Sequence, residues 1–310
     1  MWKNFGSTKN YLSVLFILTL IVIVVFGQFA TPSMAKVARQ SRYKIHRNLV
    51  YKTGNNYQLK LDVYENKKKG IHPTVMVIHG GGWIEGSKDK QKPFFSSYIN
   101  WGFSVVNIEY RLAKTALAPA AVEDCLCALR WVIRNAKKYN LDINKIVVTG
   151  FSSGGHLALT TGTMPPISGF EQQCPGTGNE PVKISAIVNW AGITDVSDVL
   201  YGNNQRYFAL EWFGNKTSSR EITLAQSISP INYVRYDVPP ILTIHGDKDK
   251  WVPYSQATRF HEALNKVRAP NYLFTVNGAA HSKFTAAQRR QINATIKAFL
   301  THYGVIDARS

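Results

Sequence analysis

The sequence predicts an α/β protein with a mostly parallel sheet of eight strands and helices on both faces of that sheet. Its 310 residues, 45% of them hydrophobic, suit one domain with one core. Short apolar runs alternate with helix-like segments after the third run, so the sheet is expected to begin antiparallel and to continue parallel. The expected strands are 45–51, 59–64, 74–79, 104–108, 146–151, 185–190, 241–245 and 272–276.

The clearest helix is expected from Ala118 to Tyr139, ending before Asn140. Pro119 falls in its first turn, where proline is well tolerated. Apolar residues recur along the segment at helical spacing and predict one buried stripe. This stripe consists of Val122, Leu126, Leu129, Val132 and Ile133.

The stretch Gly150-Phe151-Ser152-Ser153-Gly154 lies between an apolar run and a helix-like segment. A serine at the apex of a strand–turn–helix is held in a strained conformation with its hydroxyl exposed, and the flanking glycines let strand and helix approach closely. Alone, this pattern occurs in many ordinary loops. Because other parts of the chain supply a candidate base, a candidate acid and candidate oxyanion donors, Ser152 is the candidate nucleophile.

A serine hydroxyl needs a base within hydrogen-bond reach and an acid that fixes the tautomer of that base. Asp249 lies in the loop after strand 241–245, where open α/β sheets place their sites. His281 lies in a loop of small residues after strand 272–276. The chain order of Ser152, Asp249 and His281 is the order typical of α/β hydrolases.

Neighbouring residues compete for two of these roles. Asp247 could be the acid, although turn formation is its commoner role. Choosing Ser152 over Ser153 depends on the Gly-x-Ser-x-Gly register. Histidines beside motif glycines are expected to brace loops, and these are His79, His156 and His245. The other four histidines are expected to be solvated, and these are His46, His72, His261 and His302.

Three consecutive glycines follow the expected strand 74–79, in His79-Gly80-Gly81-Gly82-Trp83. Glycines leave their amide groups uncovered, so a developing oxyanion can approach them closely. The amides of Gly80 and Gly81, with that of Ser153, are therefore the candidate oxyanion hole.

Together with Glu109-Tyr110-Arg111-Leu112 and the segment 119–124, these motifs resemble those of α/β-hydrolase carboxylesterases, over about residues 45 to 305. The resemblance is greatest to the branch of feruloyl and acetyl-xylan esterases, a neighbour of the hormone-sensitive-lipase-like esterases. It implies an α/β-hydrolase fold in which Ser152 is the nucleophile, Asp249 the acid and His281 the base. The serine turn departs from the family pattern, because relatives commonly have Glu-Ser-Ala or Gly-Ser-Ala there.

The pattern loosens at about 195–232, where aromatic residues alternate with polar ones. Such an insertion between late strands could form a small lid over the serine. Trp212 of this segment, with Trp83 and Trp251 beside catalytic motifs, predicts an aromatic-lined pocket, and all three are candidate substrate-binding residues.

The N-terminal residues predict that the catalytic domain lies outside the cytoplasm. Lys3 and Lys9 precede an apolar run, 11–26, and the small-x-small triplet Ser33-Met34-Ala35 follows. This pattern predicts a signal peptide over 1–35, cleaved after Ala35. An uncleaved membrane anchor is the alternative, because the run approaches the lower limit of about 17 residues for a spanning helix. The catalytic domain, 36–310, is then secreted or periplasmic, or attached to the membrane.

The three cysteines predict one disulfide and no metal site. Cys125 and Cys127 lie two apart on one helix, so only one of them can bridge to Cys174, and Cys127 is slightly favoured. Neither Cys-x-x-Cys nor His-x-x-x-His spacing accompanies them, which argues against a metal centre.

The formal charge of +18 is large. It is consistent with a solvated surface or with attraction to anionic envelope or polysaccharide. Nucleic acid is not an expected partner, because no basic-aromatic module is present and the chain is predicted to be exported.

The sequence therefore predicts an exported serine esterase that needs no cofactor, with acetyl or feruloyl esters of plant polysaccharide among its possible substrates. One alternative is a peptidase or amidase of the prolyl-oligopeptidase type, disfavoured by the absence of a propeller-length N-terminal domain. Another is a non-catalytic binding protein on a hydrolase scaffold, disfavoured by the intact triad. The sequence does not specify the oligomeric state.

Overall fold

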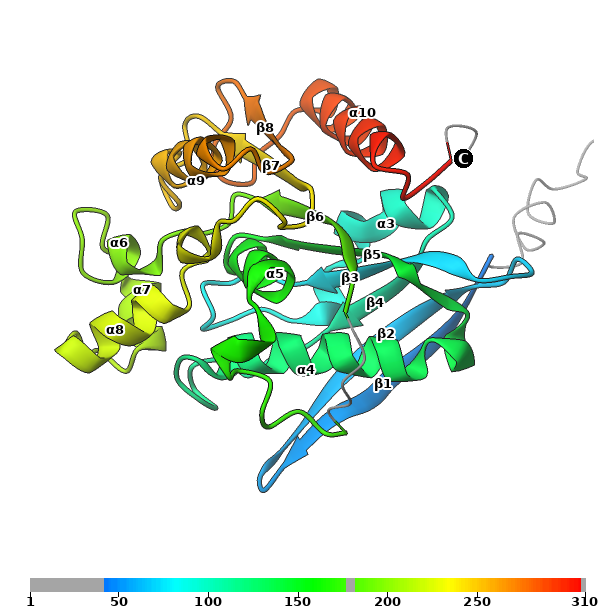
Figure 1. Cartoon of the computed structure of the whole chain (residues 1–310), viewed down its shortest axis with the longest axis horizontal. Coiled ribbons are helices and arrows are strands. Elements are labelled where there is room, and N and C mark those ends of the chain that lie inside the picture. Colours follow the sequence, from blue (N-terminus) through cyan, green and yellow to red (C-terminus); the bar gives the residue numbers. More distant parts are fainter. Residues whose placement is uncertain (1–41, 177–181, 308–310) are drawn as a thin grey trace, which may run out of the picture. The chain divides into compact units, whose positions relative to one another are not determined.

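An eight-stranded sheet organises the chain in the order β1-β2-β4-β3-β5-β6-β7-β8, as the computed structural model in Figure 1 shows. The structure describes residues 42–176 and 182–307. The strands are β1 (Tyr43–Gly54), β2 (Tyr57–Asn66), β3 (His72–Ile78), β4 (Ser104–Ile108), β5 (Leu141–Phe151), β6 (Ile184–Trp190), β7 (Ile241–Gly246) and β8 (Asn271–Val276). The β1–β2 and β2–β4 pairs are antiparallel and the remaining pairs are parallel, which confirms the predicted sheet.

Helices cover both faces of this sheet (Figure 1). They are α3 (Lys92–Asn100), α4 (Ala120–Asn135), α5 (Ser153–Thr163), α6 (Val196–Leu200), α7 (Tyr207–Trp212), α8 (Ser219–Ser227), α9 (Ser255–Lys266) and α10 (Ala286–His302). Short 3₁₀ turns are η1 (Lys88–Lys90), η2 (Lys137–Tyr139), η3 (Pro166–Ser168) and η4 (Pro230–Tyr233).

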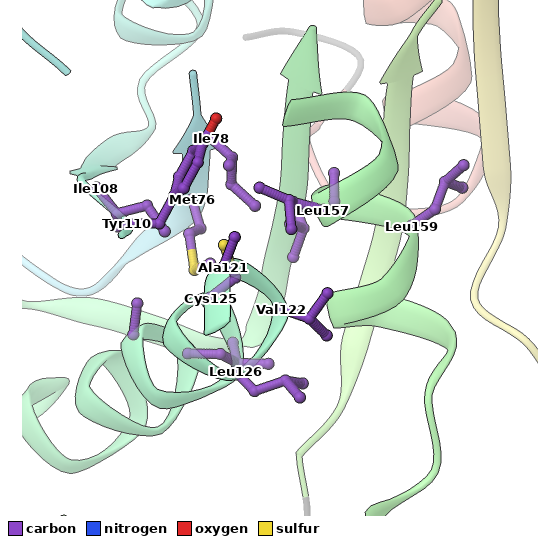
Figure 2. Close-up of a cluster of buried hydrophobic side chains, with 14 of the residues drawn as sticks. Met76, Ile78, Ile108, Tyr110, Ala121, Val122, Cys125, Leu126, Leu157 and Leu159 are labelled. Atoms are coloured by element: carbon purple, nitrogen blue, oxygen red, sulfur yellow. The ribbon is translucent and has the colours of Figure 1, made fainter. Parts of the chain in front are cut away.

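Side chains alternate across the strands and divide the core into two layers. In β3, Met76 and Ile78 pack with residues of α4, α5 and α9, whereas Val75 and Val77 pack with residues of α3 and α10. Successive residues of a strand point to opposite faces, so a run of apolar residues is buried on both sides. Figure 2 shows part of the first layer, where Val122 and Leu126 of α4 gather with Met76 and Ile78.

The predicted helix at 118–139 is α4 followed by the 3₁₀ turn η2, and Asn140 after it has a left-handed backbone (φ 54°). Four of the five predicted stripe residues are buried, and Ile133 is partly exposed. The short turn arises where the chain leaves the helix to enter β5.

A disulfide joins Cys127 of α4 to Cys174, in the loop that follows η3. Cys125 is free and buried in the core (Figure 2). The predicted pairing is confirmed, because only Cys127 lies on the helix face that meets this loop.

Two histidines expected in solvent are instead held by polar partners. His261 is 3% exposed, and its Nδ1 lies 2.6 Å from Oδ1 of Asn271. His46 lies partly buried with its Nε2 2.7 Å from Oε2 of Glu65. The expectation was wrong at both positions, because the fold brings Asn271 of β8 to His261 and Glu65 of β2 to His46.

Over 42–176 and 182–307, no cluster of three or more His, Cys, Asp or Glu side chains is arranged to hold a metal ion. The helices of these two ranges are all too short or too polar to cross a membrane. The predicted signal peptide or anchor at 1–35 lies outside the described residues.

Candidate active site

Ser152 occupies a sharp turn between β5 and α5. Its backbone has φ 59° and ψ −123°, a region that residues with side chains seldom adopt. Its amide donates to the carbonyl of Trp190 at 2.8 Å, and its own carbonyl accepts from the amide of His156 at 3.0 Å. These contacts hold the strained conformation in place.

Glycines allow this turn because backbone segments meet there. A Cβ at Gly150 would lie 2.1 Å from the carbonyl oxygen of Gly154, and a Cβ at Gly154 would lie 2.3 Å from that of Ile78. No side chain fits at such distances, so the predicted role of the flanking glycines has a direct steric reason.

Asp249 and His281 form a hydrogen-bonded pair, with Nδ1 of His281 2.6 Å from Oδ2 of Asp249. An ionised carboxylate can only accept, so Nδ1 carries the proton and Nε2 is left as the acceptor. Asp247 instead accepts from the amide of Gly278 at 2.7 Å, which is a turn-forming contact. The structure thus brings Asp249, and not Asp247, to His281.

The Asp249 carboxylate is fully buried and surrounded by donors. Its Oδ1 accepts from the amides of Trp251 at 2.8 Å and Val252 at 3.0 Å, and Nε2 of His245 lies 3.1 Å from its Oδ2. Burial alone would raise the pKa of Asp249, but the hydrogen bonds from His245 and His281, the charge of His281 and the Val252 amide hold that pKa well below its usual value. Asp249 therefore stays ionised and keeps His281 oriented.

The glycine loop after β3 presents free amides beside Ser152. The hydroxyl of Tyr110 donates to the carbonyl of His79 at 3.1 Å, and Nδ1 of His79 donates to the carbonyl of Gly80 at 2.9 Å. Among the described residues, the amides of Gly80 and Gly81 have no hydrogen-bond partner. Ser153 is the first residue of α5, where helix amides lack an internal acceptor. The three predicted oxyanion-hole residues thus surround the serine turn.

A pocket of about 310 Å³ gathers these groups. Ser152 and His281 line it together with the glycine loop. Its full lining is Gly80, Gly81, Gly82, Ile84, Glu85, Gln91, Phe151, Ser152, Tyr207, Phe208, Trp251 and His281.

Only one of the three tryptophans predicted to bind substrate lines this pocket. Trp251 does so and is 52% exposed. Trp83 and Trp212 are fully buried and stack on each other with ring centroids 4.2 Å apart. The positive φ of Trp83 (63°) accompanies this inward placement, so these two residues are corrected from substrate-binding to core positions.

The insertion at 195–232 folds into α6, α7 and α8 and contributes Tyr207 and Phe208 to the pocket. Arg206, just before α7, donates to the carbonyls of Trp251 at 2.9 Å and Lys250 at 3.3 Å. This contact ties the insertion to the loop that carries Asp249. A sequence pattern offers no signal for it, since the arginine binds backbone carbonyls 44 and 45 residues away.

The histidines beside motif glycines brace loops, as expected. His156 accepts from the indole N–H of Trp83 at its Nδ1 (3.2 Å) and donates from Nε2 to the carbonyl of Ile228 (2.8 Å). Burial lowers the pKa of His156, and also that of His79, to about 4, although each has a backbone hydrogen bond that opposes the shift. Both rings are therefore neutral near pH 7.

The sequence profile of the BD-FAE family matches residues 61–264. The chain is 30% identical over 257 residues to esterase LipC of Mycobacterium tuberculosis, covering 81% of this chain and 63% of that protein. It is 28% identical over 241 residues to esterase LipQ of the same organism, covering 76% of this chain and 56% of that protein. It thus spans about 56–63% of the length of these curated relatives.

Solved structures give the same picture of the fold. A truncated carbohydrate esterase from gut microbiota is 25% identical with a TM-score of 0.69, and the match covers 84% of this chain and 98% of that one. Propionate-bound esterase 2 of Thermogutta terrifontis is 23% identical with a TM-score of 0.72, and the match covers 89% of this chain and 99% of that one. The second similarity concerns the fold alone.

Proposed function

Because this chain belongs to the BD-FAE family and has the α/β-hydrolase fold, we propose that it is a serine esterase that hydrolyses carboxylic esters through an acyl-enzyme. The observation that carries the proposal is the hydrogen bond between His281 and the buried Asp249, next to a pocket that Ser152 shares with His281. The esterase names of LipC and LipQ support it.

In the proposed reaction, Oγ of Ser152 attacks the ester carbonyl while Nε2 of His281 takes its proton. Asp249 stabilises the imidazolium that forms. The amides of Gly80, Gly81 and Ser153 donate to the oxyanion. Collapse of the tetrahedral intermediate breaks the ester C–O bond, and His281 protonates the leaving alcohol. Water, activated by His281, then releases the acid and restores the serine.

Two substitutions at the serine turn test this proposal. Ser152→Ala removes the nucleophile and should abolish hydrolysis of p-nitrophenyl acetate with an unchanged circular dichroism spectrum. Ser153→Ala keeps the backbone amide, the only group of Ser153 in the proposed mechanism, and should retain most of the activity. A phosphonate inhibitor should label Ser152. Labelling of Ser153, or of neither serine, would contradict the assignment.

We also propose that the alcohol part of the substrate is a carbohydrate, as in acetyl or feruloyl esters of plant polysaccharide. Trp251 and Tyr207, 52% and 60% exposed, stand at the pocket and offer faces on which a sugar ring could stack. The similarity to a carbohydrate esterase supports this. Purified protein should be assayed on acetylated xylan and methyl ferulate beside p-nitrophenyl esters of graded chain length. Turnover of the simple esters alone would contradict a carbohydrate substrate.

Export of the catalytic domain is a further part of the proposal. The disulfide between Cys127 and Cys174 supports it, because disulfides persist mainly in oxidising compartments. Mass spectrometry of the protein recovered from its native host should find a chain that begins at Lys36. An intact N-terminus in the membrane fraction would favour the anchor, and recovery from the cytosol would contradict export.

A further inference from the structure

A second pocket, of about 280 Å³, lies between α3 and α10 and adjoins the catalytic pocket. It is lined by the ends of β5 and β6, by α3 and by the first turns of α10. Phe151, the residue before Ser152, lines both pockets. The volume lies just below the usual range for small-molecule sites, which suits a ligand of one or two rings.

Four of the eleven residues that line this second pocket are aromatic. Phe94, Phe151, Trp190 and Phe284 all contribute to it. The ring centroids of Phe94 and Trp190 are 5.1 Å apart and those of Trp190 and Phe284 are 6.3 Å apart, both in tilted arrangements. Aromatic faces at such angles favour a planar apolar ligand, which can meet both ring faces and ring edges.

The polar part of the lining consists of one cation, Arg289, and four neutral residues, which are Ser96, Ser97, Ser282 and Asn293. Arg289, in the first turn of α10, lines the pocket and donates from Nε to the carbonyl of Phe284 at 3.2 Å, which holds its guanidinium beside the aromatic wall. No carboxylate of the described residues forms an ion pair with Arg289. From 263 to 306 the sequence has six Lys or Arg residues and no Asp or Glu. An anion is thus favoured here over a neutral or cationic group.

We propose that this second pocket is a binding site for an aromatic carboxylate, with the ring between Phe94, Trp190 and Phe284 and the carboxylate on Arg289. The binding does not depend on the esterase activity. A bound ring would also contact Phe151, whose ring packs against that of His281 with centroids 4.6 Å apart. Occupancy should therefore slow the catalytic step, and this consequence rests on the proposed function.

Calorimetric titration of the full-length protein with 2-naphthoate and 2-naphthamide tests the binding, because the two ligands share a ring system and differ in charge. The wild type should bind the carboxylate at least about tenfold more tightly than the amide, as a charge-assisted hydrogen bond would give. Arg289→Gln should abolish that difference. Arg290→Gln, which removes a neighbouring charge outside the pocket lining, is the matched control and should preserve it. Phe94→Ala should weaken the binding of both ligands.

Equal binding of the two naphthyl ligands by the wild type, or an equal loss in both arginine variants, would overturn the site. The kinetic consequence is measured separately with p-nitrophenyl acetate, where 2-naphthoate should lower kcat more than it raises KM. Purely competitive inhibition that Arg289→Gln leaves unchanged would place the ligand in the catalytic pocket and refute the site between α3 and α10. Failure of Ser152→Ala to abolish hydrolysis would remove the esterase proposal and leave the calorimetric result standing.

Discussion

The catalytic pocket has two walls that are held by different kinds of contact. The strand-end wall, made of Gly80–Gly82, Ser152 and His281, is held mainly by backbone approaches too close for any side chain. The insertion wall, made of Tyr207 and Phe208, is held by side-chain contacts between residues that are far apart in the sequence. The first wall carries the proposed chemistry, and the second borders the space in which substrate groups would lie.

The contacts of the insertion wall are spread over several residues. Arg259 of α9 binds Asp195 and Asp198, each at 3.0 Å, and Arg206 binds the loop after Asp249. Partly exposed bonds of this kind each contribute little to stability. Substitutions in the strand-end wall should therefore stop catalysis or folding, whereas those in the insertion wall should change which esters bind.

The largest effect is expected at the acid of the strand-end wall. Asp249→Asn removes the charge that orients His281 and should lower kcat by roughly 10⁴, as loss of this group does in serine proteases. Asp247→Asn, two residues away, should reduce kcat only modestly, because its carboxylate accepts from the amide of Gly278. Steady-state kinetics on two folded variants decide the matter, and the reverse ranking would transfer the role to Asp247.

A pair of glycine substitutions compares the serine turn, which supports the strand-end wall, with the insertion that carries the other wall. Gly154→Ala places a Cβ 2.3 Å from a backbone oxygen and should lower the free energy of unfolding by about 3 kcal/mol or more. Gly214→Ala, in the insertion, meets only a flexible atom of Leu117 at 2.8 Å, so its positive φ (67°) is the main cost, about 1 kcal/mol. Urea denaturation measures both. Equal losses would show that the two regions are equally constrained.

Acid should weaken the junction between the walls, which His156 forms by joining Trp83 to Ile228. The pKa of His156 is about 4 in the folded chain and 6.5 without burial, so the unfolded chain binds the extra proton between these values. The stability from neutral His156 is thus present above pH 6.5 and lost as the pH falls through about 4. From pH 7 to 4.5 the loss is on the order of 2 kcal/mol.

Urea titrations of the wild type and His156→Gln at both pH values measure this difference. The variant should lose roughly 2 kcal/mol less stability on acidification than the wild type does. His302→Gln, at an exposed position, is the control and should behave as the wild type. A His156→Gln profile parallel to the wild type would show that His156 is not the group that titrates.

The smallest effect is expected at Arg206. Arg206→Met removes the hydrogen bonds to the carbonyls of Lys250 and Trp251. The segment that carries Tyr207 is then no longer fixed to the loop that carries Trp251. KM for bulky esters should rise about tenfold, a cost of about 1.4 kcal/mol, while kcat for p-nitrophenyl acetate stays within a factor of two or so. Arg206→Lys should restore part of the loss, and Arg220→Met in α8 should change neither constant. A fall in kcat with constant KM would instead make Arg206 part of the strand-end wall's support.

Local sequence patterns predicted the residues of the strand-end wall, because the geometry of this wall depends on residues that are close together along the chain. Gly150 and Gly154 flank Ser152 within five residues, and the strands before the serine and the glycine triplet are continuous apolar runs. Such features depend on backbone sterics that any chain with these residues shares. The choice of Asp249 over Asp247 needed more, since both lie in one loop and only the position of His281 separates them.

By itself, the sequence determined the eight strands, the strained serine turn, the glycine loop and the order of the three candidate catalytic residues, because each depends on residues that are neighbours along the chain or on a simple period. Only the tertiary structure decided which aromatic side chains face the pocket. Trp83 and Trp212 stand 129 positions apart and stack in the core, whereas Tyr207 and Trp251 reach solvent. The direction of a side chain depends on the partners that packing brings to it, and those partners are distant in sequence.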